Sequence, residues 1–151
     1  MSGTYEDGGN HRGSVFRKRV GEAVIEKEGL HEEYTEWGDG SSAKRELRLE
    51  ELEMERRVSE YLRELPFLWI DVNDEPGPGS DRSYIERNMI GLLSNYERDS
   101  VDPRGDRWLG KYSRSEKIRN SGLWNVNHVD ERYDPSFLDM LEEAVEKAEP
   151  V

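Results

Sequence analysis

The stretch Phe67-Leu-Trp-Ile-Asp-Val72, with the loop Asn73-Asp-Glu-Pro-Gly-Pro-Gly79 and the helix-forming residues after it, decides the fold. The first six residues are apolar on both faces at their start, which predicts a strand in the centre of a sheet. The Pro- and Gly-rich residues form a loop. Ser80 or Asp81 is then placed to cap a helix that runs to about Asn95. A strand followed by a helix predicts an α+β domain with a small sheet flanked by helices.

Two further helices are predicted upstream of this unit. Ser14 can cap a helix that Gly29 ends. Residues 43–64 give the clearest helical periodicity, and Pro66 ends that pattern. The apolar residues that recur at helical spacing in the second helix are Leu47, Met54, Val58, Tyr61 and Leu65.

The remaining segments complete one predicted domain over residues 14–149. Residues 1–13 are Gly-rich and polar, and we expect them to be a disordered lead-in. Residues 99–133 form an irregular extension rich in basic and aromatic residues, with a short strand at 123–129. Asp134-Pro135 is a helix start signal, so a last helix follows.

The composition is strongly acidic, with a net charge of −12. Of the 22 basic residues only six are Lys, and chains rich in acid and poor in Lys suit high salt because salt screens their self-repulsion. This pattern fits a halophilic source as well as an ordinary acidic protein. A melting series in rising KCl separates the two.

The chain contains no Cys, so neither disulfides nor thiolate metal ligands contribute to it. No apolar run approaches the roughly 18 residues of a membrane span, and the first ten residues lack the apolar core of a signal peptide. We therefore expect a cytoplasmic protein that does not enter a membrane.

The unit from Leu65 to Tyr96 resembles the C-terminal half of the GIY-YIG nuclease domain, in which a central strand leads into a helix that carries a Glu and ends at an Asn. Glu86 and Asn95 fall on those two positions. The segments beginning at His11, Trp37 and Leu123 resemble a prokaryotic branch of the same family. The likeness covers residues 11–135, and about thirty residues carry the family-wide pattern.

The resemblance implies a DNA endonuclease that hydrolyses phosphodiester bonds with a divalent cation such as Mg²⁺. Glu86 would be the catalytic metal ligand, because a hard cation takes oxygen ligands and needs few protein contacts. Bound metal stabilises charge on the scissile phosphate and its leaving oxygen. Asn95 would support the site.

The family's first hairpin is missing from this sequence. Neither Gly-Ile-Tyr nor Tyr-Ile-Gly occurs, and no Arg occupies the position of the family's helix Arg; Arg12, Arg17 and Arg19 lie elsewhere. Without those strands residues 67–72 would lack sheet partners. We therefore expect a partial domain, truncated at the N-terminus. A start site placed too late, a natural remnant that no longer cuts DNA, and a split protein completed by a partner chain all account for this.

Glu86 and Asn95 each have a structural alternative. Glu86 follows Ser83 at the spacing of a capping box, so it could serve a helix start instead of a metal. Asn95 could cap the C-terminal end of the same helix.

Residues 104–119 carry a local charge of +4, and interleaved aromatic rings offer stacking surfaces. These features fit a DNA contact and a solvated loop equally well. His128 could act as an acid or base near neutral pH, or be structural. The alternative function is a non-catalytic module that binds nucleic acid or protein, with helix 43–64 as the partner surface. The DNA-binding candidates are Arg104, Arg107, Lys111, Arg114, Lys117, Arg119, Trp124 and His128.

Overall fold

The structure, a computed structural model, describes residues 9–148, and these residues contain helices but no strand. The predicted α+β fold with a small sheet is therefore wrong for this part of the chain. The α-helices are α1 (Val15–Glu28), α2 (Arg45–Glu50), α3 (Leu52–Glu64), α4 (Asp81–Leu93), α5 (Glu116–Ser121) and α6 (Phe137–Lys147), and the short 3₁₀ helices are η2 (His11–Gly13) and η3 (Leu109–Tyr112).

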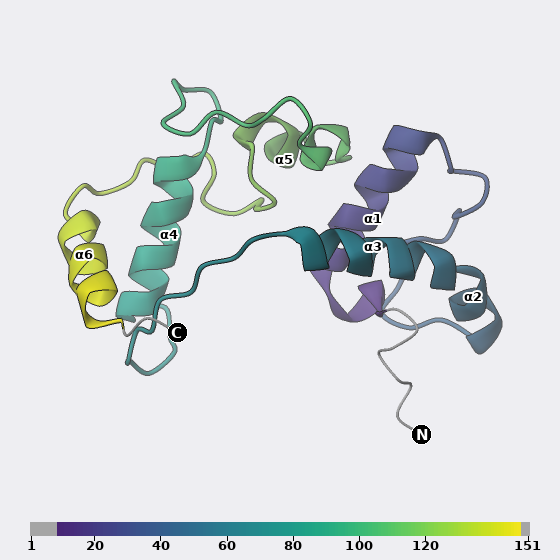
Figure 1. Cartoon of the computed structure of the whole chain (residues 1–151), viewed down its shortest axis with the longest axis horizontal. Coiled ribbons are helices and arrows are strands. Elements are labelled where there is room, and N and C mark those ends of the chain that lie inside the picture. Colours follow the sequence, from purple (N-terminus) through teal and green to yellow (C-terminus); the bar gives the residue numbers. More distant parts are fainter. Residues whose placement is uncertain (1–8, 149–151) are drawn as a thin grey trace.

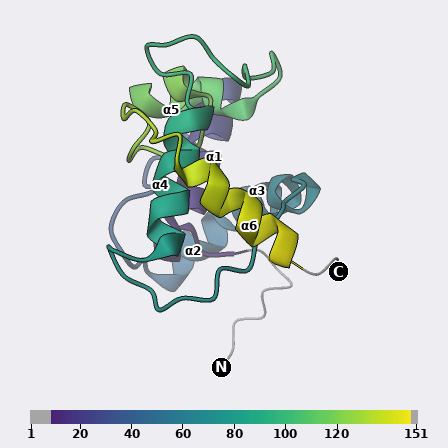
Figure 2. The same cartoon turned by 90° about the vertical axis from the view of Figure 1, so that its left-hand side faces the viewer.

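The helices gather into two halves that residues 65–80 connect (Figure 1). In the first half α1 packs against α3, with α2 beyond the end of α3. In the second half α6 packs along α4, as the rotated view also shows (Figure 2). The segment that carries η3 and α5 joins the halves, because η3 packs against both α1 and α5. The Arg114 side chain adds an ion pair to Glu26 of α1, 2.7 Å long.

Local signals define α1 as the sequence predicts. The Ser14 side chain accepts a hydrogen bond from the Arg17 N–H, and Gly29 ends the helix in the left-handed conformation at φ 70°. Inside the helix Gly21 lies against the indole of Trp37, where a Cβ atom would overlap the ring. The core forms around this contact. Its buried apolar residues are Val20, Ala23, Val24, Ile25, Trp37, Met54, Val58 and Leu109.

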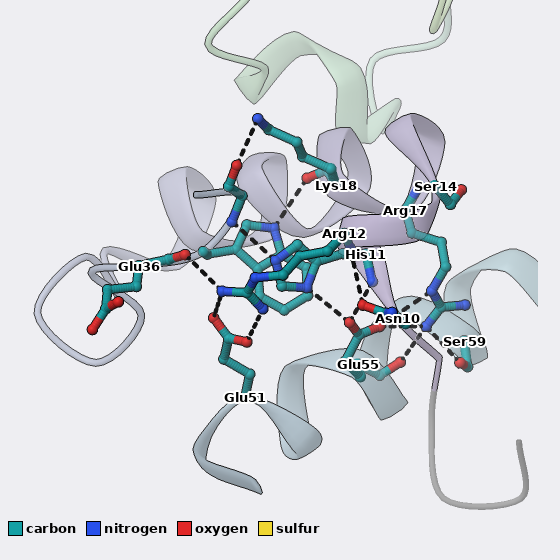
Figure 3. Close-up of polar contacts among 12 residues, drawn as sticks. Asn10, His11, Arg12, Ser14, Arg17, Lys18, Glu36, Glu51, Glu55 and Ser59 are labelled. Carbon is teal, nitrogen blue, oxygen red and sulfur yellow. Dashed lines mark hydrogen bonds and ion pairs between the residues drawn. The ribbon is translucent and has the colours of Figure 1, made fainter. Parts of the chain in front are cut away.

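The predicted helix over 43–64 is divided into α2 and α3 at Glu51. Glu51 is buried and forms an ion pair with Arg12, whose guanidinium also donates to the carbonyl of Glu36 (Figure 3). The periodic pattern predicted the helical content and could not reveal the break, because the residue that pairs at the break lies 39 positions upstream.

A buried polar network joins η2 to α3. His11 donates through Nδ1 to Oε1 of Glu55 at 2.8 Å, and its ring stacks on Trp37 with centroids 3.7 Å apart (Figure 3). Arg17 donates to the other carboxylate oxygen of Glu55 at 2.8 Å. Residues 1–8 of the predicted disordered lead-in lie outside the described residues, whereas His11 at its end is 1% exposed.

Residues 67–72, predicted as the central strand, are extended and form no ladder with another described segment. Phe67, Leu68 and Trp69 are 84%, 99% and 64% exposed. No other residue between 9 and 148 pairs with the backbone of residues 67–71. A strand needs a neighbour that completes its ladder, and the described chain provides none. The prediction of an extended apolar segment is met in conformation, but not in burial.

The second predicted strand, at residues 123–129, is also absent, and bends and turns occupy this range. The last helix begins at Phe137, two residues later than Asp134-Pro135 predicts. The Asp134 side chain still serves that start, since it accepts a hydrogen bond from the Ser136 N–H at 3.0 Å. Asp134 also accepts from the Tyr84 hydroxyl at 2.7 Å, which ties this turn to α4.

Polar contacts hold the 129–134 segment onto α4. The buried Ser94 hydroxyl donates to the Val129 carbonyl at 2.6 Å, and Arg98 donates to the carbonyls of Gly91 and Glu131 at 2.9 and 2.8 Å. The Asp134 N–H donates to Asn88 at 2.7 Å. These bonds fix the residues that follow the 122–128 loop. Within residues 9–148 no helix has the length and apolar character needed to cross a membrane.

Candidate functional site

A cleft of about 880 Å³ lies between α1, α4 and the loop 122–128. It joins segments that are more than 100 residues apart in the sequence, because the loop reaches from the second half of the molecule to α1. One wall is largely apolar and the other carries polar and charged groups. The lining residues are Val15, Phe16 and Arg19 of α1, Pro78, Ser83, Glu86, Arg87 and Ile90 on and before α4, and Gly122, Leu123, Trp124, Asn125, Val126, Asn127 and His128 of the loop.

Glu86 projects from the second turn of α4 and lines this cleft. The capping-box alternative is excluded, because Ser80 is the N-cap and its hydroxyl accepts from the Ser83 N–H at 3.1 Å. Within residues 9–148 the Glu86 carboxylate has no hydrogen bond and no ion pair. Glu86 is exposed, so its two oxygens are open to a ligand.

His128 lies on the same cleft in an unusual conformation. Its backbone has φ 63°, a left-handed value that costs a residue with a Cβ some strain. Its Nδ1 lies 2.9 Å from Oε1 of Glu131, and Arg87 donates to the other oxygen of that carboxylate at 2.5 Å. The bonds from His128 and then Arg87 hold the pKa of Glu131 below its ordinary value. The Glu131 carboxylate therefore orients both a cleft imidazole and a cleft guanidinium.

Arg19 adds a cation from α1. One guanidinium nitrogen donates to Glu22 at 3.3 Å, while its Nε is buried without a hydrogen-bond partner in the described structure. An unsatisfied buried donor costs about 1–3 kcal/mol. Sequence reasoning placed Arg19 away from the site, because nothing local shows that α1 faces α4. The exposed apolar residues Val15 and Phe16, one turn earlier on the helix, were the available signal.

Asn95 lies outside the cleft and organises the backbone behind it. Its N–H donates to the Ser121 carbonyl at 2.8 Å. With the amide oriented so that both atoms find partners, it donates to the Asp102 carbonyl at 3.2 Å and accepts from the Arg104 N–H at 3.3 Å. Ser94, not Asn95, is the C-cap of α4. Asn95 thus joins the end of α4 to the C-terminal end of α5 and to residues 102–104.

The basic residues predicted as a DNA surface do not line the cleft. Arg114 and Lys117 form ion pairs with Glu26 and Asp130. Three others donate to backbone carbonyls: Arg104 to Arg119, Lys111 to Asp106, and Arg119 to Ser113 and Arg114. Arg107 is exposed. Of the eight predicted DNA-binding residues the structure brings only Trp124 and His128 to the cleft with Glu86.

The cleft residues fit a hard divalent cation held by few protein atoms. Among residues 9–148 no group of three or more His, Asp or Glu side chains is arranged to hold a metal. Mg²⁺ does not require one, because it commonly keeps several waters and takes one or two carboxylates together with substrate phosphates. The open carboxylate of Glu86 and the amide oxygens of Asn125 and Asn127 are donors of the right kind. The residues present therefore suit a weak site that a phosphate would complete.

Comparisons with known proteins give the family of the chain. A family model described as GIY-YIG domain matches residues 1–151. No curated protein and no solved structure matches the chain. The match covers the whole chain, including Glu86, Asn95 and the cleft loop. This protein belongs to the GIY-YIG domain family, a family of nucleases that act on DNA and generally use divalent metal ions.

Proposed function

We propose that this chain forms part of a metal-dependent DNA endonuclease site, with Glu86 as the metal ligand. The main support is the position of Glu86, which the sequence predicts as the metal ligand. Its carboxylate is open in a cleft that also contains Arg19, Arg87 and His128. A carboxylate, cations and an imidazole in one cleft are the groups that phosphodiester hydrolysis needs.

Each cleft group has a separate role in the proposal. Glu86, with an amide oxygen of Asn125 or Asn127, would hold the cation, which when bound polarises the phosphate and lowers the pKa of water. Arg19 binds a phosphate oxygen through the accessible part of its guanidinium, which also donates to Glu22. His128 presents its Nε2 as a proton donor or acceptor, since Nδ1 is engaged with Glu131. The apolar wall formed by Phe16 and Trp124 limits access of bulk water.

Completion by a further polypeptide segment is part of the proposal. Phe67, Leu68 and Trp69 leave large apolar side chains in water, and the backbone groups of residues 67–71 are unpaired within the described chain. The sequence also lacks the tripeptides Gly-Ile-Tyr and Tyr-Ile-Gly. Both observations support a site completed by a further polypeptide segment, in the same protein or in a partner chain. Activity of residues 1–151 alone would then be weak or absent.

A plasmid-nicking assay with Mg²⁺ or Mn²⁺ tests the metal assignment. It compares the wild-type chain with Glu86→Gln and Glu86→Ala, each with and without an added polypeptide that contains the Gly-Ile-Tyr and Tyr-Ile-Gly sequences. The expected result is metal-dependent nicking in the completed protein and a loss of at least about 100-fold in both variants. Glu142→Gln is the matched control, because Glu142 is an exposed glutamate of α6 remote from the cleft lining. Full nicking by Glu86→Ala would disprove the assignment.

A non-catalytic binding module is the second candidate. The exposed Phe67-Leu68-Trp69 segment favours it, since large exposed apolar patches mark interaction sites. Helix 43–64, the partner surface predicted from sequence, packs its Met54 and Val58 inward against the core. If the completed protein binds its partner and does not nick DNA with either metal, this second function is the correct one.

A further inference from the structure

The aromatic wall of the cleft is held rigidly from behind. The Trp124 indole contacts the rings of Phe16, Tyr61 and Trp108, with centroids 5.8, 6.4 and 5.6 Å away. All three meet it at interplanar angles of 60° to 76°, so none of them stacks parallel to it. Phe16 is 40% exposed at the edge of the same cleft. This wall is apolar and fixed, and it offers ring surface to a flat ligand.

Polar groups around this wall have unused hydrogen-bonding capacity. The Arg19 Nε has no partner, although the atom is buried. Asn125 and Asn127 are exposed on the cleft, and their side chains make no hydrogen bond to another described residue. An amide can both donate and accept, which is the capacity required to contact the edge of a nucleobase. Unused cationic and amide groups beside a ring surface match the parts of a nucleotide.

The charge and the volume of the cleft limit the kind of ligand that it can bind. The cleft lining contains the cations Arg19 and Arg87, which pair with Glu22 and Glu131 behind the lining, and the single acid Glu86, whereas the chain as a whole has a net charge of −12. The remaining acidic surface disfavours long contacts with a polyanion, so a polynucleotide would be held at few phosphates. A cleft of about 880 Å³ is in the size range of small-molecule pockets. Paired bases are stacked inside a duplex and cannot reach such a wall unless they are extruded.

We propose that the cleft binds one unpaired nucleotide of a DNA strand, with its base against the Phe16–Trp124 wall and its phosphate at Arg19. Of Asn125 and Asn127, the one that does not hold the cation contacts the edge of the base. This inference rests on the proposed function for the identity of the polymer, and it names the substrate class as DNA with an unpaired or extruded nucleotide. The six basic residues of the 104–119 segment are not needed for it.

Equilibrium binding without divalent metal tests the proposal, because no cleavage occurs under those conditions. Fluorescence anisotropy compares a labelled dT8 oligonucleotide with a 12-base-pair blunt duplex on the whole chain at low salt. The expected result is at least ten-fold tighter binding of dT8. Because stacking of a base on a ring is worth on the order of ten-fold in affinity, Phe16→Leu should weaken dT8 binding about ten-fold. Arg19→Gln should weaken it by a similar factor, since it removes a charged phosphate contact.

Matched controls separate the cleft from general surface effects. Leu138→Ala removes an apolar side chain of α6 that is 41% exposed, close to the value for Phe16, and Lys147→Gln removes one exposed positive charge. Both should leave dT8 binding unchanged. The slope of log affinity against log salt should lie between about −0.7 and −1.4, as expected for one or two phosphates of a single strand.

The outcomes distinguish this inference from the proposed function. Equal affinity for both probes, no binding of either, or unchanged dT8 binding by either Phe16→Leu or Arg19→Gln overturns the nucleotide site. A salt slope steeper than about −4 also overturns it, because the chain would then follow the backbone over many phosphates. Loss of nicking in Glu86→Ala with intact dT8 binding supports both proposals. If Glu86→Ala loses nicking and Phe16→Leu binds dT8 normally, the proposed nuclease function stands and the proposed nucleotide site is wrong.

Discussion

The Nδ1 atom of His11 lies 2.8 Å from Oε1 of Glu55, although 44 residues separate them in the sequence. The Gly38 N–H donates to the Nε2 of the same imidazole at 3.0 Å, so Nδ1 carries the ring proton. Both side chains are almost completely buried. This pair, with the Trp37 ring stacked on the imidazole, connects η2, the 30–42 loop and α3 in the first half of the molecule.

Glu55→Ala should strongly destabilise the chain. The substitution leaves the His11 and Arg17 donors buried without their acceptor, and breaking a buried pair costs about 3–5 kcal/mol. Thermal or urea unfolding followed by circular dichroism measures the change. Glu60→Ala, an exposed glutamate on the same helix, should change the free energy of unfolding by less than about 0.5 kcal/mol. Similar losses in the two variants would show that the network adds nothing to stability.

Low pH should reduce the stability of the folded protein, in part because Glu55 becomes protonated. Burial raises the pKa of this carboxyl, but the hydrogen bonds from His11 and Arg17 outweigh burial and place the pKa below its ordinary value of 4.5. A lowered folded-state pKa gives stability that is complete above about pH 4.5 and is lost as the pH falls through the folded value. Melting temperatures from pH 3 to 7 should therefore fall less steeply below pH 4.5 for Glu55→Gln than for the wild type. Parallel curves would contradict the assignment.

Gly21→Ala should destabilise the first half, against the usual effect of this change in a helix. Replacing an interior helical Gly by Ala ordinarily gains about 1 kcal/mol. Here the added Cβ would overlap the buried Trp37 ring, and forcing extra volume into a packed core costs about 1–3 kcal/mol. Urea unfolding and the Trp fluorescence spectrum measure the outcome. Gly105→Ala, which meets nothing within 4 Å, is the control and should have little effect.

Substitutions in the exposed segment should have little effect on stability and alter association. Leu68 is 99% exposed and Phe67 is 84% exposed, so Phe67→Ser with Leu68→Ser removes almost no buried area. The free energy of unfolding should change by less than about 0.5 kcal/mol. Light scattering of concentrated samples should decrease, because an exposed apolar strand promotes association. A loss above about 2 kcal/mol would show that these side chains are buried in solution.

Local signals in the sequence predicted the helices well. Ser14, Gly29 and Ser80 define the ends of α1 and α4 through contacts within a few residues, and these predictions are confirmed. The predicted strands were wrong because a ladder requires a partner segment that periodicity cannot supply. The break between α2 and α3 at Glu51 was also missed because it depends on a distant residue. Glu51 pairs with Arg12, which lies near the start of the chain.

The candidate site was predicted only in part. Glu86, Trp124 and His128 were identified from sequence, and they line one cleft. The roles of these residues stay predictions. Local charge counting selected residues 104–119, but Arg114 and Lys117 of that segment are paired with acidic side chains. Arg19 could not be selected, because its place opposite α4 depends on how η3 and the 122–128 loop pack against α1.

The lining of the cleft comes from both halves of the molecule, from α1 in the first and from α4 and the 122–128 loop in the second. A ligand that contacts both walls would resist opening of either half by mass action, adding about 2.7 kcal/mol at 100 times its dissociation constant. Amide hydrogens in α1 and in α4 would then exchange with solvent at a common, slower rate, although neither helix contains the hydrogen-bond acceptors of the other. Occupancy of the cleft would then couple the opening of the two halves more tightly than the η3 and α5 contacts do alone.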